Sequence, residues 1–242
     1  MSARPTQLLW GISEIATLDG PQSFAMSFDD FEADVASADD VLQSLGVARG
    51  DSVLAVSTFA ESGVYAPVFE AAWRRGIIVS CAEATAADAY RVALLIRVLP
   101  RLRSVVGIND AVLDGLAAAE QDISSVFAGE AVVAARPSAW ARLPHAGVPA
   151  RLWVHLGPAL GVECTERAGA HIASGWHIDS DAEGILTINA ATERACGVQR
   201  WRAEGRWSRV AQPCACGRTT PRVVARDAND AGTTTAGAVP PG

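Results

Sequence analysis

Short apolar runs alternate with longer amphipathic segments through the first part of the chain, and this alternation constrains the fold more than any other feature. Four runs have the length and the β-branched content of buried strands: residues 51–57, 77–81, 104–108 and 131–135. Segments with helical spacing precede and separate these runs: residues 28–46, 60–75, 85–100 and the segment that Asn109 caps. Strands joined by helices form parallel βα units. We therefore predict an α/β fold with a flavodoxin-like, mostly parallel sheet and flanking helices.

The pattern changes near residue 150, where strands become amphipathic and Trp, Arg and Cys become frequent. Residues 177–188, "HIDSDAEGILTI", have acidic residues and a glycine between two strand-like halves, which is typical of a β-hairpin. We predict an α/β subdomain over 1–149 and a smaller β-rich Cys/His subdomain over 150–226. Residues 227–242 are predicted to be a disordered tail, because their composition gives them no means to pack.

The charge and hydropathy of the chain exclude two classes of partner. The net charge is −7, whereas contacts to nucleic-acid phosphates need a basic surface. The longest apolar stretch, residues 92–99, contains Arg97 and is too short to span a bilayer. The N-terminus does not have the pattern of a signal peptide. We expect no nucleic-acid or membrane partner, and a cytoplasmic protein whose five cysteines stay reduced.

Residues 213–222, "PCACGRTTPR", place Cys214 and Cys216 one residue apart. With Cys164 and His171 they offer three thiolates and an imidazole, a common ligand set for structural zinc. Two other interpretations fit the same residues. The cysteines could fill a β-rich core beside a hydrogen-bonded histidine, or form a redox pair, although exchange motifs normally have the spacing Cys-x-x-Cys. We take these four residues as the candidate metal ligands.

Other polar residues have simpler interpretations. Glu61 precedes Ser62 in "FAESG", but no histidine lies near it in the sequence, so the segment is interpreted as a helix cap. His145 and His155 are each isolated. The acidic residues of 177–184 are interpreted as turn residues rather than as a metal or acid–base cluster.

Three stretches, taken together, resemble the adenylate-forming acyl-CoA ligases of the phenylacetate–CoA ligase type. "LQSLGVARGDSVLAVS", "RRGIIVSCAEATAADAYRVALLIRVL" and "SVVGIND" are similar to the nucleotide-fold part of those enzymes. Residues 157–172, "GPALGVECTERAGAHI", are similar to the stretch after their active-site Tyr-Gly-x-x-Glu motif. Within 198–223, "VQRWRAEGRWSRV" and "CACGRTTPRV" are similar to their Arg-Tyr-Arg-Thr-Gly-Asp strand and their Cys-x-Cys-Gly-Arg-Thr segment. The resemblance covers about residues 15–226.

The resemblance implies a chemistry and its parts. Such ligases activate a carboxylic acid with ATP, forming an acyl-adenylate and pyrophosphate, and then transfer the acyl group to coenzyme A. The reaction needs a Gly/Ser/Thr loop around the phosphates, a carboxylate near the adenylate and Mg²⁺, and an Asp on the ribose. It also needs a lysine on a mobile C-terminal domain. Some members of this type carry cysteines and a histidine at the places of the four candidate ligands, which implies a zinc site.

The chain departs from the family pattern at the phosphate loop and at the catalytic motif. The loop corresponds to residues 15–24, which hold one glycine, and Asp19 stands where an anion would bind. The tyrosine and glutamate positions of the motif are occupied by Ala150 and Val154. These residues supply neither the phosphate cradle nor the carboxylate that the chemistry needs.

The chain also departs at the ribose and lysine positions. The ribose Asp corresponds to Gly205 or Arg206, and the hinge near 225–230 is followed by 12 residues rather than by a domain. The chain has no lysine, since all 20 of its Lys and Arg residues are arginine. No ammonium group is therefore available to offset charge at a reacting carboxylate.

Four departures from one mechanism predict a degenerate acyl-CoA-ligase-like protein without ATP-dependent adenylation of its own. It would bind a carboxylate ligand, an acyl carrier or a partner enzyme. One alternative is an active ligase of this type, split or with an altered site, which would use ATP and coenzyme A. Another is an assembly module in a biosynthetic pathway. The expected cofactor in the leading interpretation is structural zinc, and the possible partners are a small carboxylic acid or acyl group and a partner enzyme.

Overall fold

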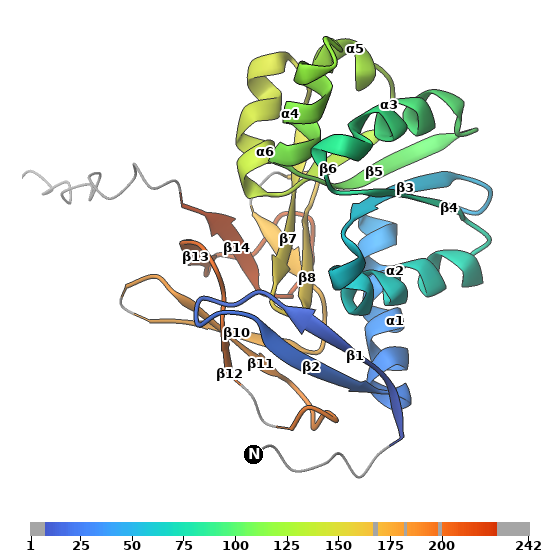
Figure 1. Cartoon of the computed structure of the whole chain (residues 1–242). Coiled ribbons are helices and arrows are strands. Elements are labelled where there is room, and N and C mark those ends of the chain that lie inside the picture. Colours follow the sequence, from blue (N-terminus) through green and yellow to red (C-terminus); the bar gives the residue numbers. More distant parts are fainter. Residues whose placement is uncertain (1–7, 167–168, 182, 198–199, 227–242) are drawn as a thin grey trace, which may run out of the picture.

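The computed structural model describes residues 8–166, 169–181, 183–197 and 200–226. Its main feature is a nine-stranded sheet with the strand order β13-β14-β9-β8-β7-β6-β5-β3-β4 (Figure 1). The tail predicted over 227–242 lies outside the described residues. The predicted α/β class, with a mostly parallel central sheet, flanking helices and a small antiparallel Cys/His part, is confirmed.

The parallel half of the sheet contains the predicted apolar runs. It consists of β3 (Ser52–Ser57), β4 (Ile78–Glu83), β5 (Leu102–Ile108), β6 (Val132–Ala135) and β7 (Ala150–Leu156). β3 lies inside the sheet, between β5 and β4, and five of its six residues are buried. A parallel strand that is covered on both faces needs such a continuous apolar run.

Helices cover both faces of this half. One face carries α1 (Phe28–Ser44) and α2 (Ser62–Arg74), and the other carries α3 (Ala89–Val98), α4 (Asp110–Ala118), α5 (Ile123–Val126) and α6 (Pro137–Arg142) (Figure 1). Asn109 caps α4 as predicted, since its side chain accepts a hydrogen bond from the Val112 N–H at 3.1 Å. Short 3-10 turns precede α2 (Phe59–Glu61) and α3 (Ala86–Asp88) and follow α6 (Leu143–Ala146).

The sheet continues beyond β7 with antiparallel pairing. These strands are β8 (Ala159–Glu163), β9 (Ala170–Ile172), β13 (Trp207–Val210) and β14 (Arg222–Ala225). The change from parallel to antiparallel pairing occurs between β7 and β8. The subdomain boundary near residue 150 stays a prediction.

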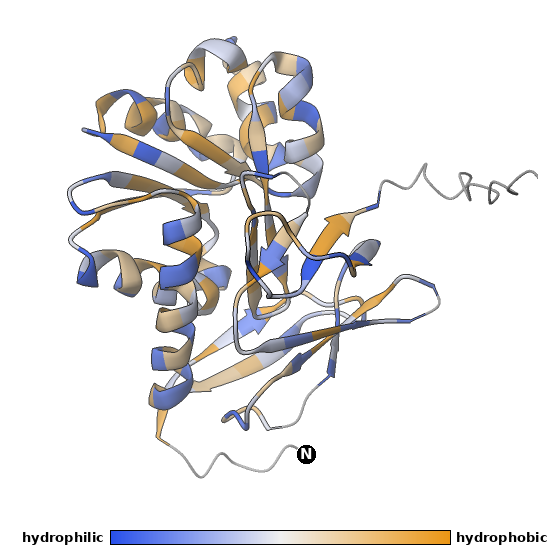
Figure 2. Cartoon of the chain, turned by 180° about the vertical axis from the view of Figure 1, so that it is seen from behind, coloured by the Kyte–Doolittle hydropathy of each residue, from blue (hydrophilic) through white to orange (hydrophobic). Residues whose placement is uncertain are grey.

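Two small antiparallel sheets pack beside the main one. β1 (Leu9–Ile15) pairs with β2 (Gln22–Ser27), and β10 (Trp176–Ser180), β11 (Leu186–Ala190) and β12 (Arg200–Arg202) form the other. The β10–β11 pair is the predicted hairpin. Phe24 joins the two sheets, with its ring centroid 6.3 Å from that of Trp176 and 5.7 Å from that of Trp201. Figure 2 shows the apolar strands at the centre and polar residues on the outer helix surfaces.

Within the described part of the chain, no helix combines the length and apolar character needed to cross a membrane.

Candidate functional site

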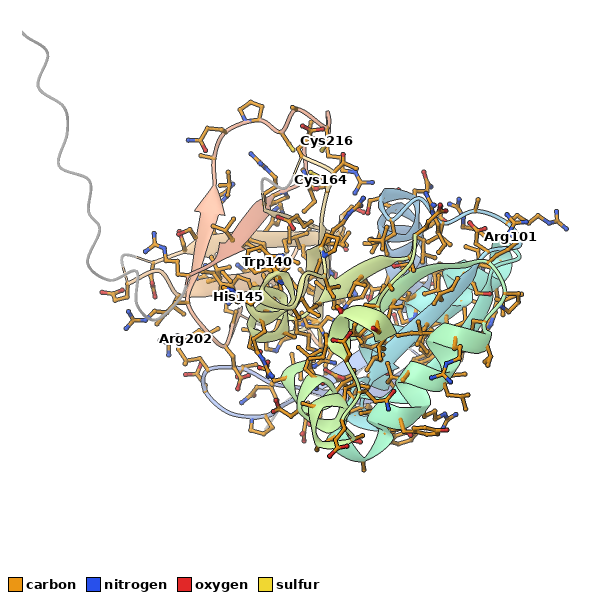
Figure 3. The ribbon with its side chains drawn as sticks, turned by 90° about the horizontal axis from the view of Figure 1, so that it is seen from above. Arg101, Trp140, His145, Cys164, Arg202 and Cys216 are labelled. Carbon is orange, nitrogen blue, oxygen red and sulfur yellow. The ribbon has the colours of Figure 1, made fainter. Side chains whose placement is uncertain are left out.

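The antiparallel end of the main sheet brings together the four predicted metal ligands. Cys164 directly follows β8, His171 lies in β9, and Cys214 and Cys216 lie in the loop between β13 and β14. β14 pairs with β9 so that Arg222 lies opposite His171, and this register draws the loop toward the strand. The ligand atoms of the four residues all lie within 4.8 Å of one another. Figure 3 shows Cys164 and Cys216 close together at the edge of the molecule.

The distances and the donor set fit a tetrahedral metal ion. The Sγ atoms of Cys164 and Cys214 are 3.5 Å apart, and Cys216 Sγ is 3.3 Å from His171 Nε2. In a tetrahedral zinc site with Zn–S distances of about 2.3 Å, neighbouring sulfur ligands lie about 3.8 Å apart. The sulfur atoms are too distant for a disulfide, which needs an S–S distance of about 2.05 Å. This largely buried Cys₃His group could therefore hold a metal ion such as zinc.

The surroundings of His171 suit a ligand role. Thr220 Oγ1 lies 3.1 Å from Nδ1, so the ring can donate its proton there and keep the lone pair of Nε2 toward the sulfur atoms. Burial, together with the positive charges of Arg218 and Arg222, lowers the pKa of His171. The imidazole is thus held in the neutral form that binds metals.

A second site lies at the carboxyl edge of the parallel strands, where ligands of open α/β sheets usually bind. It is a hollow of about 310 Å³. Its polar lining comes from segments that end or follow the strands: Thr58 and Glu61 after β3, Arg136 after β6, and His155 in β7. Ile15, Val64 and Trp153 contribute apolar walls, and Glu14 and Glu204 add two further carboxylates.

Glu61 and Arg136 form the central ion pair of this hollow. The two guanidinium nitrogens of Arg136 donate to the two carboxylate oxygens of Glu61 at 2.7 and 2.8 Å. Glu61 also accepts hydrogen bonds from the Thr58 N–H at 2.8 Å and from its hydroxyl at 3.1 Å. Burial opposes the ionisation of Glu61, but the nearby His155 ring and the hydrogen bonds from Arg136 outweigh it and hold the pKa well below its usual range. Glu61 is therefore a carboxylate at neutral pH.

His155 supports this pair from β7. Its Nδ1 lies 3.6 Å from Glu61 Oε1, and its Nε2 accepts a hydrogen bond from the Trp153 indole at 2.9 Å. With Nε2 as the acceptor, the ring proton is on Nδ1 and faces Glu61. The predicted cap is confirmed: Glu61 is the N-cap residue of α2, and its side chain forms a capping box with Thr58 at the 3-10 turn before that helix. The expectation that His155 is isolated is wrong, because the ring contacts both Glu61 and Trp153.

The positions that depart from the ligase pattern have ordinary structural roles. Asp19, in the turn between β1 and β2, forms an ion pair with Arg202 of β12 at 2.8 Å. Ala150 and Val154 are buried within β7. Gly205 has φ +81° in the turn between β12 and β13, a conformation that favours glycine.

Comparisons with known proteins show solved structures with a similar fold. No family model matches the chain, and no curated protein matches it. A crystal structure of 2-hydroxyisobutyryl-CoA ligase, in an open conformation with 2-HIB-AMP and CoA, is similar over 90% of this chain and 56% of the ligase, with 13% identity and a TM-score of 0.63. The same ligase in its postadenylation state with R3-HIB-AMP matches 90% of this chain and 52% of the ligase, with 14% identity and a TM-score of 0.62.

The fold therefore resembles that of adenylate-forming acyl-CoA ligases, and the chain spans about half the length of the ligase chains that it matches. The resemblance predicted from the sequence is confirmed at this level. The phenylacetate–CoA ligase type stays a prediction.

Proposed function

We propose that this protein is an acyl-CoA-ligase-like binding protein that does not adenylate a carboxylic acid on its own. In this proposal, the hollow at the carboxyl edge of the sheet holds an uncharged acyl group, such as that of a thioester or an amide. The observation that carries it is the pairing of Arg136 with Glu61.

The charge of the hollow argues against an ionised acid as its ligand. Among the described residues that line it, Arg136 is the one permanent cation, and Glu61 occupies its guanidinium fork. Glu14 and Glu204 would add repulsion to an incoming carboxylate or triphosphate. Ile15, Val64 and Trp153 offer a neutral acyl group an apolar surface.

The turn between β1 and β2 supports the lack of adenylation. The Thr17 hydroxyl donates to the Gly20 carbonyl at 2.7 Å and accepts from the Asp19 N–H at 3.3 Å. Asp19 itself is paired with Arg202. The turn is thus closed on its own groups and its carboxylate is paired with an arginine, whereas a phosphate cradle needs open N–H groups.

Carboxylate-dependent pyrophosphate exchange tests the first part of this proposal. We expect no exchange above background with phenylacetate and other aryl acids. Robust exchange by the purified chain would establish the alternative of an active ligase. Exchange that appears only when a lysine-bearing partner chain is added would favour the split form of that alternative.

Binding of an amide and of its parent acid tests the second part. Trp153 lines the hollow, so its fluorescence can follow a titration with phenylacetamide and with phenylacetate at pH 7.5. We expect the amide to bind more tightly. In Glu61→Gln the Arg136 fork is open to a ligand carboxylate, and we expect phenylacetate affinity to rise roughly tenfold.

Glu70→Gln is the matched control, because it makes the same change on the outer part of α2, where Glu70 pairs with Arg74. It should leave both affinities unchanged. Tight phenylacetate binding by the unmodified protein, with no gain in Glu61→Gln, would overturn the assignment of a neutral ligand.

We further propose that zinc occupies the Cys₃His group. Four protein ligands leave no open position for water, so the ion would be structural. It would tie the ends of β8 and β9 to the loop before β14.

A further inference from the structure

The second half of "PCACGRTTPR" lines a groove beside the candidate metal site, and Cys214 is the one candidate ligand among the described residues that line it. Residues 217–220, "GRTT", follow Cys216, and Arg218, Thr219 and Thr220 form one wall. The groove encloses about 670 Å³, and its other walls come from the end of β10, the end of β13, residues 211–214 and the start of β14. It shares no lining residue with the hollow at the carboxyl edge.

Positive charge dominates this groove. Arg209, Arg218 and Arg222 line it, and no carboxylate residue does so within the described part of the chain. The cluster is local, because the chain as a whole has a net charge of −7.

Arg209 and Arg218 keep much of their positive charge, because the protein groups beside them do not fully neutralise it. Arg218 donates to the backbone carbonyl of Asp40 at 3.3 Å, which orients the guanidinium without neutralising it. Arg209 is half-exposed and lies 3.9 Å from Asp179, which is a long and solvent-screened contact. Arg222 is buried and donates to the backbone carbonyl of Gln212. A zinc ion with three thiolates would carry one negative charge, which is less than the two positive charges of Arg209 and Arg218.

We propose that this groove binds a phosphate group. The guanidinium fork matches the oxygen pairs of phosphate, and a phosphate dianion can pair with more than one arginine at once. A monocarboxylate has one charge and one oxygen pair, so it engages fewer of these donors. The exposed Thr219 hydroxyl and Ser180 add neutral donors to the wall.

Isothermal titration of the full, zinc-loaded chain at fixed ionic strength tests this site, with inorganic phosphate, methyl phosphate and acetate as probes. We expect both phosphates to bind more tightly than acetate. Methyl phosphate binding at least as tightly as inorganic phosphate indicates an ester ligand, while binding of inorganic phosphate only indicates the free ion. Equal binding of acetate and phosphate would overturn the proposal.

Arg209→Gln is the main variant, because Arg209 lies in β13, outside the metal-binding loop. We expect it to weaken phosphate binding roughly tenfold and to leave the zinc content unchanged. Arg97→Gln removes the same charge from the exposed surface of α3 and should have no effect.

Unchanged phosphate affinity in Arg209→Gln, or an equal loss in Arg97→Gln, would mean that the groove arginines only balance the thiolates or attract anions nonspecifically. Because the groove and the acyl-binding hollow are separate, phosphate binding and the binding of phenylacetamide can fail independently of each other.

Discussion

Arg194 and Asp34, 160 residues apart in the sequence, form a buried ion pair with two parallel hydrogen bonds of 2.7 and 2.8 Å. The Arg194 guanidinium also lies over the Trp176 ring, 4.1 Å from its centroid. Asp34 belongs to α1, whereas Arg194 follows β11. The pair therefore fastens the helix layer to the three-stranded sheet.

Arg194→Met tests this contact. The methionine keeps apolar contact with Trp176 but leaves the Asp34 carboxylate buried without its partner. We expect a loss of about 3–5 kcal/mol in the free energy of unfolding, measured by urea denaturation with circular dichroism. Arg142→Met breaks the exposed pairs with Asp110 and Asp114 and should cost less than about 1 kcal/mol. Equal effects would contradict this role for the buried pair.

Zinc binding predicts a defined stoichiometry. Purified protein should contain close to one zinc per chain, and a chelator should lower the free energy of unfolding by several kcal/mol. Cys214→Ser should release the metal. Cys81→Ser should not, because Cys81 lies on β4 at the other end of the main sheet.

Metal analysis separates this outcome from simple core packing. If the protein holds no zinc and Cys214→Ser changes stability no more than Cys81→Ser, the four residues are packing groups. In that case, residues 213–222 form a turn and line the groove, but they do not bind a metal.

The surroundings of Gly107, near the carboxyl end of β5, predict a further effect on stability. Its φ is +87°, and an added Cβ would lie 2.2 Å from the Val56 carbonyl oxygen and 2.3 Å from the Tyr65 hydroxyl. Gly107→Ala should therefore cost several kcal/mol in chemical denaturation. Gly147 has φ +75° but open space around it, so Gly147→Ala should cost only about 1 kcal/mol. Similar losses of stability in both variants would show that the positive φ, and not the steric clash, determines the cost of the substitution.

The parallel strands were predictable because their burial on both faces requires continuous apolar runs. The four candidate ligands could also be picked out as a possible donor set, since three cysteines and a histidine are a recognisable combination even before strand pairing is known. That they bind a metal stays a prediction. That β14 would lie beside β9 could not be predicted, because the alternation of side chains does not specify which strands pair.

The carboxyl-edge site was only partly visible in the sequence. Glu61 and Arg136 are 75 residues apart, and neither has a local pattern that points to the other. Their positions within a few residues of strand ends were the available signal, because the carboxyl ends of parallel strands meet at one edge. A role for His155 was harder to predict, because this residue lies inside β7. Whether its side chain reaches the hollow depends on how β7 is placed in the sheet.

The buried state of His155 predicts a pH dependence of stability. Glu61, Arg136 and Tyr65 are the charged and titratable groups that face it. Burial lowers the pKa of His155, and the charge of Arg136 adds to this effect against the opposing influence of Glu61. In the unfolded chain the histidine pKa returns to about 6.5. The unfolded state therefore binds more protons as the pH falls through this value, and stability decreases by up to about 1.4 kcal/mol per pH unit.

His155→Gln isolates this contribution, because a glutamine can accept from Trp153 and donate toward Glu61 but does not titrate. Urea denaturation between pH 8 and pH 5 should show a shallower loss of stability in the variant than in the unmodified protein. His145 is exposed, so His145→Gln should keep the original slope. If His155→Gln and the unmodified protein lose stability in parallel over this range, His155 takes up its proton equally in both states, and the polar network around Glu61 must accommodate an imidazolium.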